Sequence, residues 1–391
     1  MHAIFRNEEA DPERARSYDF ALTDEYLAAV HATGARMIYR LGESIEHAQT
    51  KRFVHPPRDL EKWSAACLGI IRHYNEGWAN GFQYQIQYWE IWNEPENRPA
   101  MWSGTDEDYY RLYHAAARAI KTRYPALKVG GPGAGYSGRF VEGRFEASEF
   151  VTNFLARCRR ESLPLDFFSW HCYTADPQEL VARARAIRQL LDAHGFANTE
   201  SHLNEWNYLP NNSWDMLSKT SPAGARQEAY EAMSGAAGAA FLTTALIELQ
   251  DAPLDVSNFY HGDIGAFGLF NEYGVPTKNF YGMRAFQELL RHPARVETRG
   301  GAPGKLALAA GISADRVRAA LLVSNFNYER REFQVQAAGL PWNTAANYEV
   351  FTTDARWNWQ KIHTGKLAAG QAEFKLELPA PGVALIQFQR E

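Results

Sequence analysis

Short apolar runs alternate with stretches of helical spacing along the first three quarters of the chain. The run at residues 35–43 begins after Gly34, which is typical of a buried strand. The segment Asp24–Thr33 before it has the spacing of a helix that stops at Gly34. The pattern predicts further strands at Tyr88–Asn93, Leu127–Gly131, Leu165–Tyr173, Ser201–Asn207 and Asp255–Tyr260. It predicts further helices after Pro56-Pro57 and over Thr105–Ile120, Glu149–Arg159, Pro177–His194, Ala225–Leu249 and Lys278–Leu290.

Strand and helix alternate without a hairpin, so we expect parallel strands that are joined by helical crossovers. The apolar residues form continuous runs, as expected for strands that are buried on both faces. This pattern predicts an α/β fold of the TIM-type (β/α)8 barrel class. A closed barrel of that class has eight strand–helix units in about 250 residues, and about six are found here.

The pattern changes after Pro293. Short segments separated by Gly, Pro and Asn predict an antiparallel sheet domain. Its strands are expected at Leu306–Ala309, Val317–Ser324, Glu332–Ala337, Tyr348–Phe351, Glu373–Leu378 and Val383–Gln389. We therefore expect a barrel domain over residues 1–293 and a β-sandwich accessory domain over residues 294–391. No low-complexity linker separates the two, so they are expected to pack together.

Composition narrows the classes of function. The chain has 41 Lys and Arg against 46 Asp and Glu, which argues against nucleic acid or an anionic membrane as its main partner. No apolar run reaches the roughly 18 residues that a membrane-spanning helix needs. Aromatic residues make up 13% of the chain and include 11 Trp. They fit either a large core or flat faces on which sugar rings stack.

Two glutamates stand at the ends of predicted strands in similar surroundings. Glu94 follows Trp-Asn and precedes Pro95, and Glu205 lies in Asn-Glu-Trp-Asn. Barrel enzymes keep their catalytic groups at such strand ends. Pro95 is expected to hold Glu94 in extended backbone geometry. One such glutamate is more often part of a salt bridge, but two in matching Trp and Asn context favour catalysis.

A pair of carboxylates suits the hydrolysis of glycosides. One carboxylic acid protonates the departing oxygen, and a second carboxylate meets the positive charge that develops at the sugar carbon. Bringing two carboxylates together raises the pKa of one of them, which keeps a proton available near neutral pH. Asn93, beside Glu94, is expected to donate a hydrogen bond to a sugar hydroxyl.

Several motifs follow one another along the predicted barrel. They are SYDF (17–20), HPPRDLEKW (55–63), EIWNEP (90–95), KVGGP (128–132), LPLDF (163–167), HCYT (171–174), FGL (267–269) and KNFY (278–281). In these motifs and their order the chain resembles clan A glycoside hydrolases, and more narrowly glycoside hydrolase family 39, which includes β-xylosidases and α-L-iduronidases. The resemblance places Glu94 at the end of barrel strand four and Glu205 at the end of strand seven. It implies a retaining, β-xylosidase-like glycosidase with Glu94 as acid/base and Glu205 as nucleophile, whose carboxyls lie about 5–5.5 Å apart.

Strand parity adds further candidates. His171 and Tyr173 share one face of their strand, and if that face looks into the barrel both line its mouth, as the resemblance also implies. The alternative for His171 is a core histidine bonded to neighbouring backbone. Tyr260, at the end of the last predicted strand, is a further candidate for sugar contact. Trp206 has the opposite parity to Glu205 and is expected to pack against helices.

The same parity turns Glu90 into the barrel, one layer below Glu94. A buried carboxylate needs a partner. Arg40, on the neighbouring strand, stands where family members carry an acidic residue. We therefore predict an interior ion pair between Arg40 and Glu90.

No metal site or cofactor is expected. The histidines are scattered, and the three cysteines show no Cys-x-x-Cys spacing. The glycine-rich stretch at residues 130–135 lacks the Lys-Ser/Thr of a phosphate-binding loop. The expected partner is an oligosaccharide or glycoside substrate.

Two features depart from the family pattern. The family's first two barrel strands would precede Ile4, so we expect a barrel that lacks them. The loop at residues 42–47 carries Glu43 where an apolar residue is usual, so xylosidase specificity does not transfer directly.

Two other functions stay open at this point. One is a catalytically impaired carbohydrate-binding protein on a truncated barrel, and the other is an interaction module that recruits a partner through exposed strand edges. The sequence does not decide the sugar, the linkage, exo or endo action, the oligomeric state or sugar binding by the C-terminal domain. A cytoplasmic location is favoured, with a lost signal peptide left open.

Overall fold

A computed structural model describes residues 4–42, 53–214, 218–337, 340–369 and 373–391. The chain divides into two compact units. The first comprises Met1–Cys172, Ala186–Asn204 and Leu254–Ser257, and the second comprises Tyr173–Arg185, Glu205–Pro253 and Asn258–Glu391. The predicted boundary at residue 293 stays a prediction.

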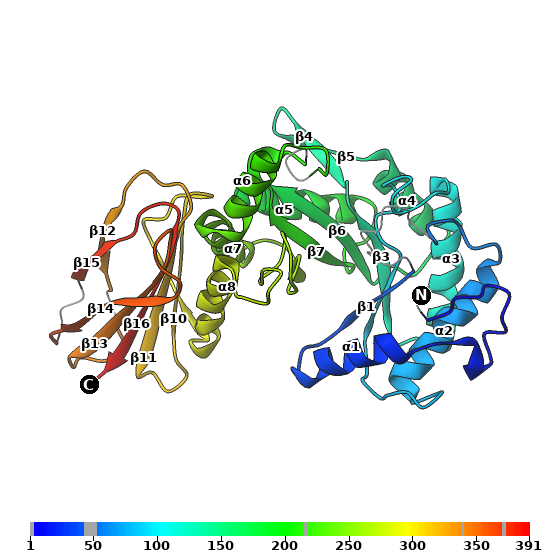
Figure 1. Cartoon of the computed structure of the whole chain (residues 1–391), viewed down its shortest axis with the longest axis horizontal. Helices are drawn as coiled ribbons and strands as arrows, with labels where there is room; N and C mark the ends of the chain where they lie inside the picture. The colour runs from blue at the N-terminus through cyan, green and yellow to red at the C-terminus, as the bar shows by residue number, and fades with distance from the viewer. Residues whose placement is uncertain (1–3, 43–52, 215–217, 338–339, 370–372) are drawn as a thin grey trace. The chain divides into compact units, whose positions relative to one another are not determined.

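One sheet has the strand order β1-β2-β3-β6-β7-β8 (Figure 1), and β6, β7 and β8 each have residues in both units. These strands are β1 (Ile38–Leu41), β2 (Tyr88–Ile91), β3 (Lys128–Ala134), β6 (Phe167–Thr174), β7 (Glu200–Tyr208) and β8 (Val256–Phe259). The pairs β1–β2, β2–β3 and β3–β6 are parallel. The predicted barrel class is therefore confirmed, with six strands of this sheet in the described residues where a closed barrel has eight.

Helices connect these strands as the pattern predicts. They are α1 (Ala21–Ala32), α2 (Leu60–Glu76), α3 (Asp106–Arg123), α4 (Glu149–Arg160) and α5 (Pro177–Ala193). The predicted start of α3 is confirmed, because Thr105 and Asp108 form a reciprocal capping box. Helix α2 begins after Asp59, whose side chain accepts hydrogen bonds from two backbone N–H groups.

Two expectations for the barrel part are wrong. The predicted helix over Ala225–Leu249 is two helices, α6 (Ala223–Ser234) and α7 (Ala236–Leu249), because Gly235 takes an extended backbone between them. The expectation that strands and helices alternate without a hairpin is also wrong, because β4 (Gly138–Val141) and β5 (Arg144–Ala147) form a hairpin after β3. Its turn residues, Glu142 and Gly143, both have positive φ, as tight hairpin turns require.

Among the described residues, no single helix is long and apolar enough to cross a membrane. The bent pair α6 and α7 passes that test together, by length and composition only.

The second unit contains the predicted antiparallel domain. Its larger sheet has the order β14-β13-β16-β11-β10-β9, and β12 pairs with β15 in a smaller one. The strands are β9 (Ala294–Val296), β10 (Leu306–Ile312), β11 (Arg318–Asn325), β12 (Glu332–Gln336), β13 (Ala346–Thr353), β14 (Gln360–Leu367), β15 (Glu373–Glu377) and β16 (Gly382–Arg390). Of these, β9 and β14 were not predicted. Most residues of β14 are exposed, so it lacks the apolar alternation that marks a strand.

Barrel helices pack directly on this sandwich within the second unit. These helices are α7 and α8 (Lys278–Glu288). The buried Ser324 of β11 donates to the carbonyl of Ala240 in α7 and accepts from Thr244 of the same helix. The expectation that the sandwich packs on the barrel part is thus confirmed for these two helices.

Candidate active site

An ion pair lies inside the sheet of the first unit. Arg40 of β1 and Glu90 of β2 are paired in register, and Arg40 Nε lies 2.6 Å from Glu90 Oε2. Only 2% of the Glu90 side chain is exposed. Asn204 of β7 donates to the other carboxylate oxygen of Glu90 at 2.7 Å. Burial works to raise the pKa of Glu90, but Arg40, Ser169 and His171 together outweigh it and the pKa is lowered. The predicted Arg40–Glu90 pair is confirmed.

The chain turns sharply where β2 ends, and this turn presents Glu94. Glu94 has a φ of 45° and Trp92 a φ of 70°, both in the left-handed region. The expectation of extended geometry at Glu94 is therefore wrong. The N–H of Glu94 donates to the carbonyl of Gly133, and its own carbonyl accepts from the N–H of Asn97. These two hydrogen bonds fix the turn in a conformation that non-glycine residues seldom adopt.

The Glu94 carboxylate is held from both sides. Oε1 lies 2.7 Å from Nδ1 of His171, and Oε2 accepts from Nδ2 of Asn97 at 3.0 Å. The His171 side chain is fully buried, whereas 14% of the Glu94 side chain is exposed. A Cβ added to Gly135 would lie 2.6 Å from Oε1 of Glu94, so the backbone after β3 approaches this carboxylate as only glycine allows.

Two neighbouring carboxyls have pKa values that move in opposite directions. Burial works to raise the pKa of Glu94, but the hydrogen bond and charge of His171, with help from Asn97, bring it below its usual range. Burial raises the pKa of Glu96 to about 7, and the charge of Glu94 adds to this effect. In the free protein, the group that holds a proton near neutral pH is therefore Glu96 and not the predicted acid.

Asn93 is buried next to the acid, with 1% of its surface exposed. Within the described residues its side-chain oxygen accepts no hydrogen bond. A Cβ on Gly133 would lie 3.3 Å from this oxygen and 3.3 Å from Oε1 of Glu90. Asn93 therefore lies between the interior ion pair and the carboxylate turn, while its contact with sugar stays a prediction.

Glu205 is presented by β7 in the second unit. It is 6% exposed, and the hydroxyl of Tyr173 donates to its Oε2 at 3.0 Å. Trp206, the next residue, packs against Phe241 of α7 and Phe259 of β8, as its opposite parity predicts. This hydrogen bond fixes the position of the Glu205 carboxylate.

Aromatic rings surround the phenol that binds Glu205. The Tyr173 ring contacts Tyr260, Phe267 and Trp214, with centroids 6.3, 5.6 and 5.1 Å away. The amide of Asn207 donates to the carbonyls of Tyr260 and Phe267, which ties these residues to β7. We call Tyr173, Trp214, Tyr260 and Phe267 the aromatic cluster.

The sequence analysis missed Trp214, a member of the aromatic cluster that is 52% exposed. The high tryptophan content was the only signal that pointed to such a residue, since Trp214 lies in a loop without periodicity. The predicted site residues thus form two groups. Asn93, Glu94 and His171 lie in the first unit, and Tyr173, Glu205 and Tyr260 lie in the second. The loop with Glu43 lies outside the described residues.

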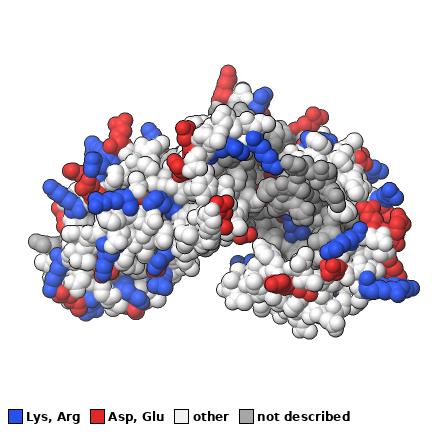
Figure 2. Space-filling view, in the orientation of Figure 1, with Lys and Arg blue, Asp and Glu red and all other residues white. Residues whose placement is uncertain are grey.

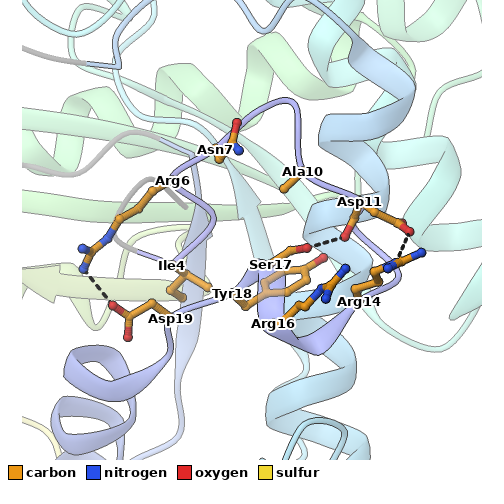
Figure 3. A pocket seen from close by; sticks show the side chains of 10 residues that line it. All are labelled: Ile4, Arg6, Asn7, Ala10, Asp11, Arg14, Arg16, Ser17, Tyr18 and Asp19. Atoms are coloured by element: carbon orange, nitrogen blue, oxygen red, sulfur yellow. Dashed lines mark hydrogen bonds and ion pairs between the residues drawn. The ribbon is translucent and has the colours of Figure 1, made fainter.

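A separate pocket lies along the N-terminal segment and contains none of the predicted site residues. Its charged side chains pair with one another, Arg6 with Asp19 at 3.1 Å and Arg14 with Asp11 at 3.0 Å (Figure 3). The hydroxyl of Ser17 donates to the backbone carbonyl of Asp11. These contacts pair Arg6, Asp11, Arg14 and Asp19 with one another, and Arg16 also lines the pocket.

On the face shown in Figure 2, basic and acidic side chains are interspersed. The absence of a nucleic-acid partner stays a prediction.

Two curated relatives of the chain are β-xylosidases. It is 27% identical to a β-xylosidase of Geobacillus stearothermophilus over 241 residues, which are 54% of this chain and 45% of that protein. It is 26% identical to a β-xylosidase of Caldicellulosiruptor saccharolyticus over 326 residues, 74% of this chain and 59% of that protein. The chain thus spans about half the length of these relatives.

Solved structures share the fold over nearly the whole chain. A glucosidase from Croceicoccus marinus matches with a TM-score of 0.83 and 25% identity, over 99% of this chain and 85% of that one. A GH39 enzyme from Xanthomonas axonopodis pv. citri matches with a TM-score of 0.74 and 18% identity, over 96% of this chain and 83% of that one. The family model described as glycosyl hydrolases family 39 matches residues 1–292. The chain therefore belongs to glycosyl hydrolases family 39.

Proposed function

We propose that this protein is a retaining glycoside hydrolase that cleaves β-xylosides or closely related β-glycosides. Membership of the family and the names of the curated relatives support the reaction class. In this proposal Glu94 is the acid/base and Glu205 the nucleophile. Glu94 lies in the turn after β2 and Glu205 in the carboxyl-terminal half of β7, on the side of the sheet where enzymes with this fold keep their catalytic groups.

One observation carries the proposal furthest. Strand β6 supplies a partner to each carboxylate, because His171 bonds Glu94 and Tyr173 bonds Glu205. The two partners are two residues apart on one strand, so their side chains leave the same face of the sheet. Strand β6 thus places an imidazole beside the Glu94 carboxylate and a phenol beside the Glu205 carboxylate. This difference in surroundings suits two carboxylates with different tasks.

The first half of the reaction forms a bond to the enzyme. A carboxylate oxygen of Glu205 attacks the anomeric carbon while the bond to the leaving oxygen breaks, and Glu94 delivers its proton to that oxygen. The electron pair of the broken bond stays with the leaving group. Tyr173 donates to Oε2 of Glu205 and holds this carboxylate in place for the attack.

The second half returns the enzyme to its starting state. Glu94, now ionised, takes a proton from water, and the water oxygen displaces Glu205 from the anomeric carbon. The released sugar keeps its anomeric configuration after two displacements. We assign Asn93 to a sugar hydroxyl and the aromatic cluster to the apolar face of the sugar ring.

His171 prepares Glu94 for both halves of the cycle. A hydrogen bond between an imidazole nitrogen and a carboxylate oxygen carries its proton on either atom. With the proton on the imidazole, Glu94 is ionised and able to act as a base. With the proton on Glu94, the imidazole accepts the hydrogen bond and the carboxyl is ready to act as an acid.

A panel of nitrophenyl glycosides tests the proposal. We expect hydrolysis of the β-xyloside or β-glucoside, and a loss of about 10³-fold or more in kcat for Glu205→Gln. Azide restores turnover to a Glu94→Ala variant if Glu94 is the acid/base, because a small anion then replaces the missing base. The matched control, Glu142→Gln on the exposed hairpin turn, keeps wild-type activity. Binding of the sugars without any hydrolysis would instead support a carbohydrate-binding protein.

A further inference from the structure

The Glu94 carboxylate has an enclosed side and an exposed side. Oε1 lies 2.7 Å from Nδ1 of the fully buried His171, and the backbone of Gly135 lies against the same oxygen. Oε2 accepts a hydrogen bond of 3.0 Å from Nδ2 of Asn97, which is an exposed residue. In the proposed reaction, the leaving oxygen must come within hydrogen-bond distance of this carboxyl. The leaving group therefore approaches from the side of Asn97.

Asn97 has hydrogen-bonding groups to spare on this side. A side-chain amide offers two N–H donors and one oxygen acceptor. One N–H donates to Glu94, and within the described residues the other N–H and the amide oxygen have no partner. The backbone of Asn97 is held in place, because its N–H donates to the carbonyl of Glu94 and its carbonyl accepts from the N–H of Met101. A fixed amide with a spare donor and acceptor suits the recognition of hydroxyl groups.

An exposed aromatic residue lies next to the same carboxylate. Tyr136 is 53% exposed, and in the part of the chain that the structure describes its side chain makes no ring contact and no hydrogen bond. A methyl group on Gly135 would lie 2.6 Å from Oε1 of Glu94, and consecutive Cα atoms are about 3.8 Å apart. The Cα of Tyr136 is therefore within roughly 8 Å of that oxygen.

A hydrogen bond ties Tyr136 to the turn that carries Asn97. The N–H of Tyr136 donates to Oε1 of Glu96 at 2.7 Å, and Glu96 precedes Asn97 in the chain. A single exposed tyrosine needs no explanation on a protein surface. This one is fixed to the turn that presents both Glu94 and the amide with spare hydrogen-bonding groups, so its position is specific.

We propose that Asn97 and Tyr136 bind the leaving group of the substrate, and that this leaving group is a sugar unit. The inference rests on the proposed role of Glu94 as acid/base. An aromatic ring packs on the apolar face of a sugar and an amide binds its hydroxyls, so the two residues supply both kinds of contact that a sugar ring offers. A small alcohol offers neither. The preferred substrates are therefore disaccharides and longer chains.

Two substrates with the same glycone separate this role from an effect on Glu94. Xylobiose has a sugar as leaving group, whereas methyl β-xyloside has only methanol. Both leaving oxygens belong to alcohols and need a proton from the acid. The value of kcat/KM covers the reaction up to the departure of the leaving group. A residue that binds the leaving sugar therefore affects xylobiose alone, and a residue that acts through Glu94 affects both substrates.

The first test measures kcat/KM on both substrates. We expect Tyr136→Ala to lower the value for xylobiose about 2- to 10-fold and to leave that for methyl β-xyloside unchanged. Tyr136→Phe keeps the ring and should keep the activity. Asn97→Ala also removes a hydrogen bond of Glu94, so its effect is judged by the ratio of the two values, which should fall about 2- to 10-fold. The control is Tyr26→Ala, which removes a 66% exposed ring from α1.

Two results would overturn the proposal. Equal losses of Tyr136→Ala on xylobiose and methyl β-xyloside would mean that Tyr136 acts through Glu94. A loss on the nitrophenyl xyloside without a loss on xylobiose would mean that the site binds an aryl group and not a sugar.

The second test needs no turnover. Calorimetry on Glu205→Gln compares the binding of xylobiose with that of methyl β-xyloside, and cellobiose with methyl β-glucoside covers the glucose pair. We expect a disaccharide to bind more tightly than its methyl glycoside, and Tyr136→Ala to reduce this gain about 2- to 10-fold. The absence of a gain in both pairs, or a gain that Tyr136→Ala leaves intact, rejects the site. If the gain is present and the wild type hydrolyses no glycoside, the proposed function fails while the sugar site stands. If hydrolysis occurs and the variants do not separate the substrates, only this inference fails.

Discussion

Arg40 and Glu90 face each other across β1 and β2 with their charged groups 2.6 Å apart, inside the sheet that carries the carboxylate turn. We predict that Arg40→Met lowers the free energy of unfolding by roughly 3–5 kcal/mol, because it leaves the buried Glu90 without its cation. Urea denaturation of the 391-residue chain measures the change.

Two controls sharpen this test. Arg40→Met combined with Glu90→Gln should recover much of the lost stability, since the double variant buries no unpaired charge. Arg139→Met, in the exposed pair of Arg139 with Glu146, should change stability by less than about 1 kcal/mol. Equal losses for the buried and exposed pairs would contradict the account of the interior ion pair.

Gly135→Ala tests how tightly the backbone after β3 fits against Glu94. The new methyl group would lie 2.6 Å from the carboxylate oxygen, so Glu94 must move. A displacement of about 1 Å in a catalytic group costs roughly 10²-fold in rate, and we predict a loss of that order in kcat. Circular dichroism checks that the fold persists. Gly224→Ala, whose methyl group meets no neighbour and which, like Gly135, has no positive φ, controls for the change of residue. Unchanged kcat in Gly135→Ala would show that Glu94 is not fixed as described.

Trp214→Ala tests the aromatic cluster as a binding surface. Loss of one stacked aromatic ring is worth about 0.5–1.5 kcal/mol, so we predict a rise in KM of about 2- to 10-fold with kcat little changed. Trp214 contacts Tyr173 and Phe267 at centroid distances of 5.1 and 6.0 Å. The control is Tyr273→Ala, which removes an 81% exposed ring outside the aromatic cluster. Identical KM values for Trp214→Ala and the wild type would remove Trp214 from the substrate site.

The dependence of stability on pH gives an independent view of Glu96. Its pKa is about 7 in the folded protein against 4.5 for the free group, so between these values the folded state holds a proton that the unfolded state has released. Stability from this group is therefore full below 4.5 and is lost as the pH rises through 7. We predict that the melting temperature of Glu96→Gln minus that of the wild type increases as the pH rises from 5 to 7. A constant difference across that range would contradict this prediction.

Much of the barrel was predictable because its strands are continuous apolar runs and its helices have readable caps, as at Thr105 and Asp108. The ion pair of Arg40 and Glu90 followed from strand parity, which turns Glu90 inward, from the need of a buried carboxylate for a partner, and from the place of Arg40 on the neighbouring strand. The break at Gly235 was not predictable, because both flanking segments are alanine-rich and keep helical periodicity across it.

Site residues that lie on strands or directly after them were predictable from the sequence, whereas the conformation and the residues of loops were not. Glu94, His171 and Glu205 could be found because each lies in the carboxyl-terminal half of a strand or directly after it. The positive φ of Glu94 depends on hydrogen bonds to Gly133 and Asn97, which no local pattern encodes. Trp214 is held by rings from distant segments, so only the folded chain reveals it.

The central claim is that Glu205 is the nucleophile of a retaining glycosidase. The most direct measurement is peptide mass spectrometry after incubation with the 2-deoxy-2-fluoro analogue of the sugar that the panel identifies. Such analogues slow the hydrolysis of a covalent intermediate, so the account predicts one glycosyl adduct on the peptide that contains Glu205 and none in Glu205→Gln. An adduct on another carboxylate, or hydrolysis with inverted configuration and no adduct, would contradict it.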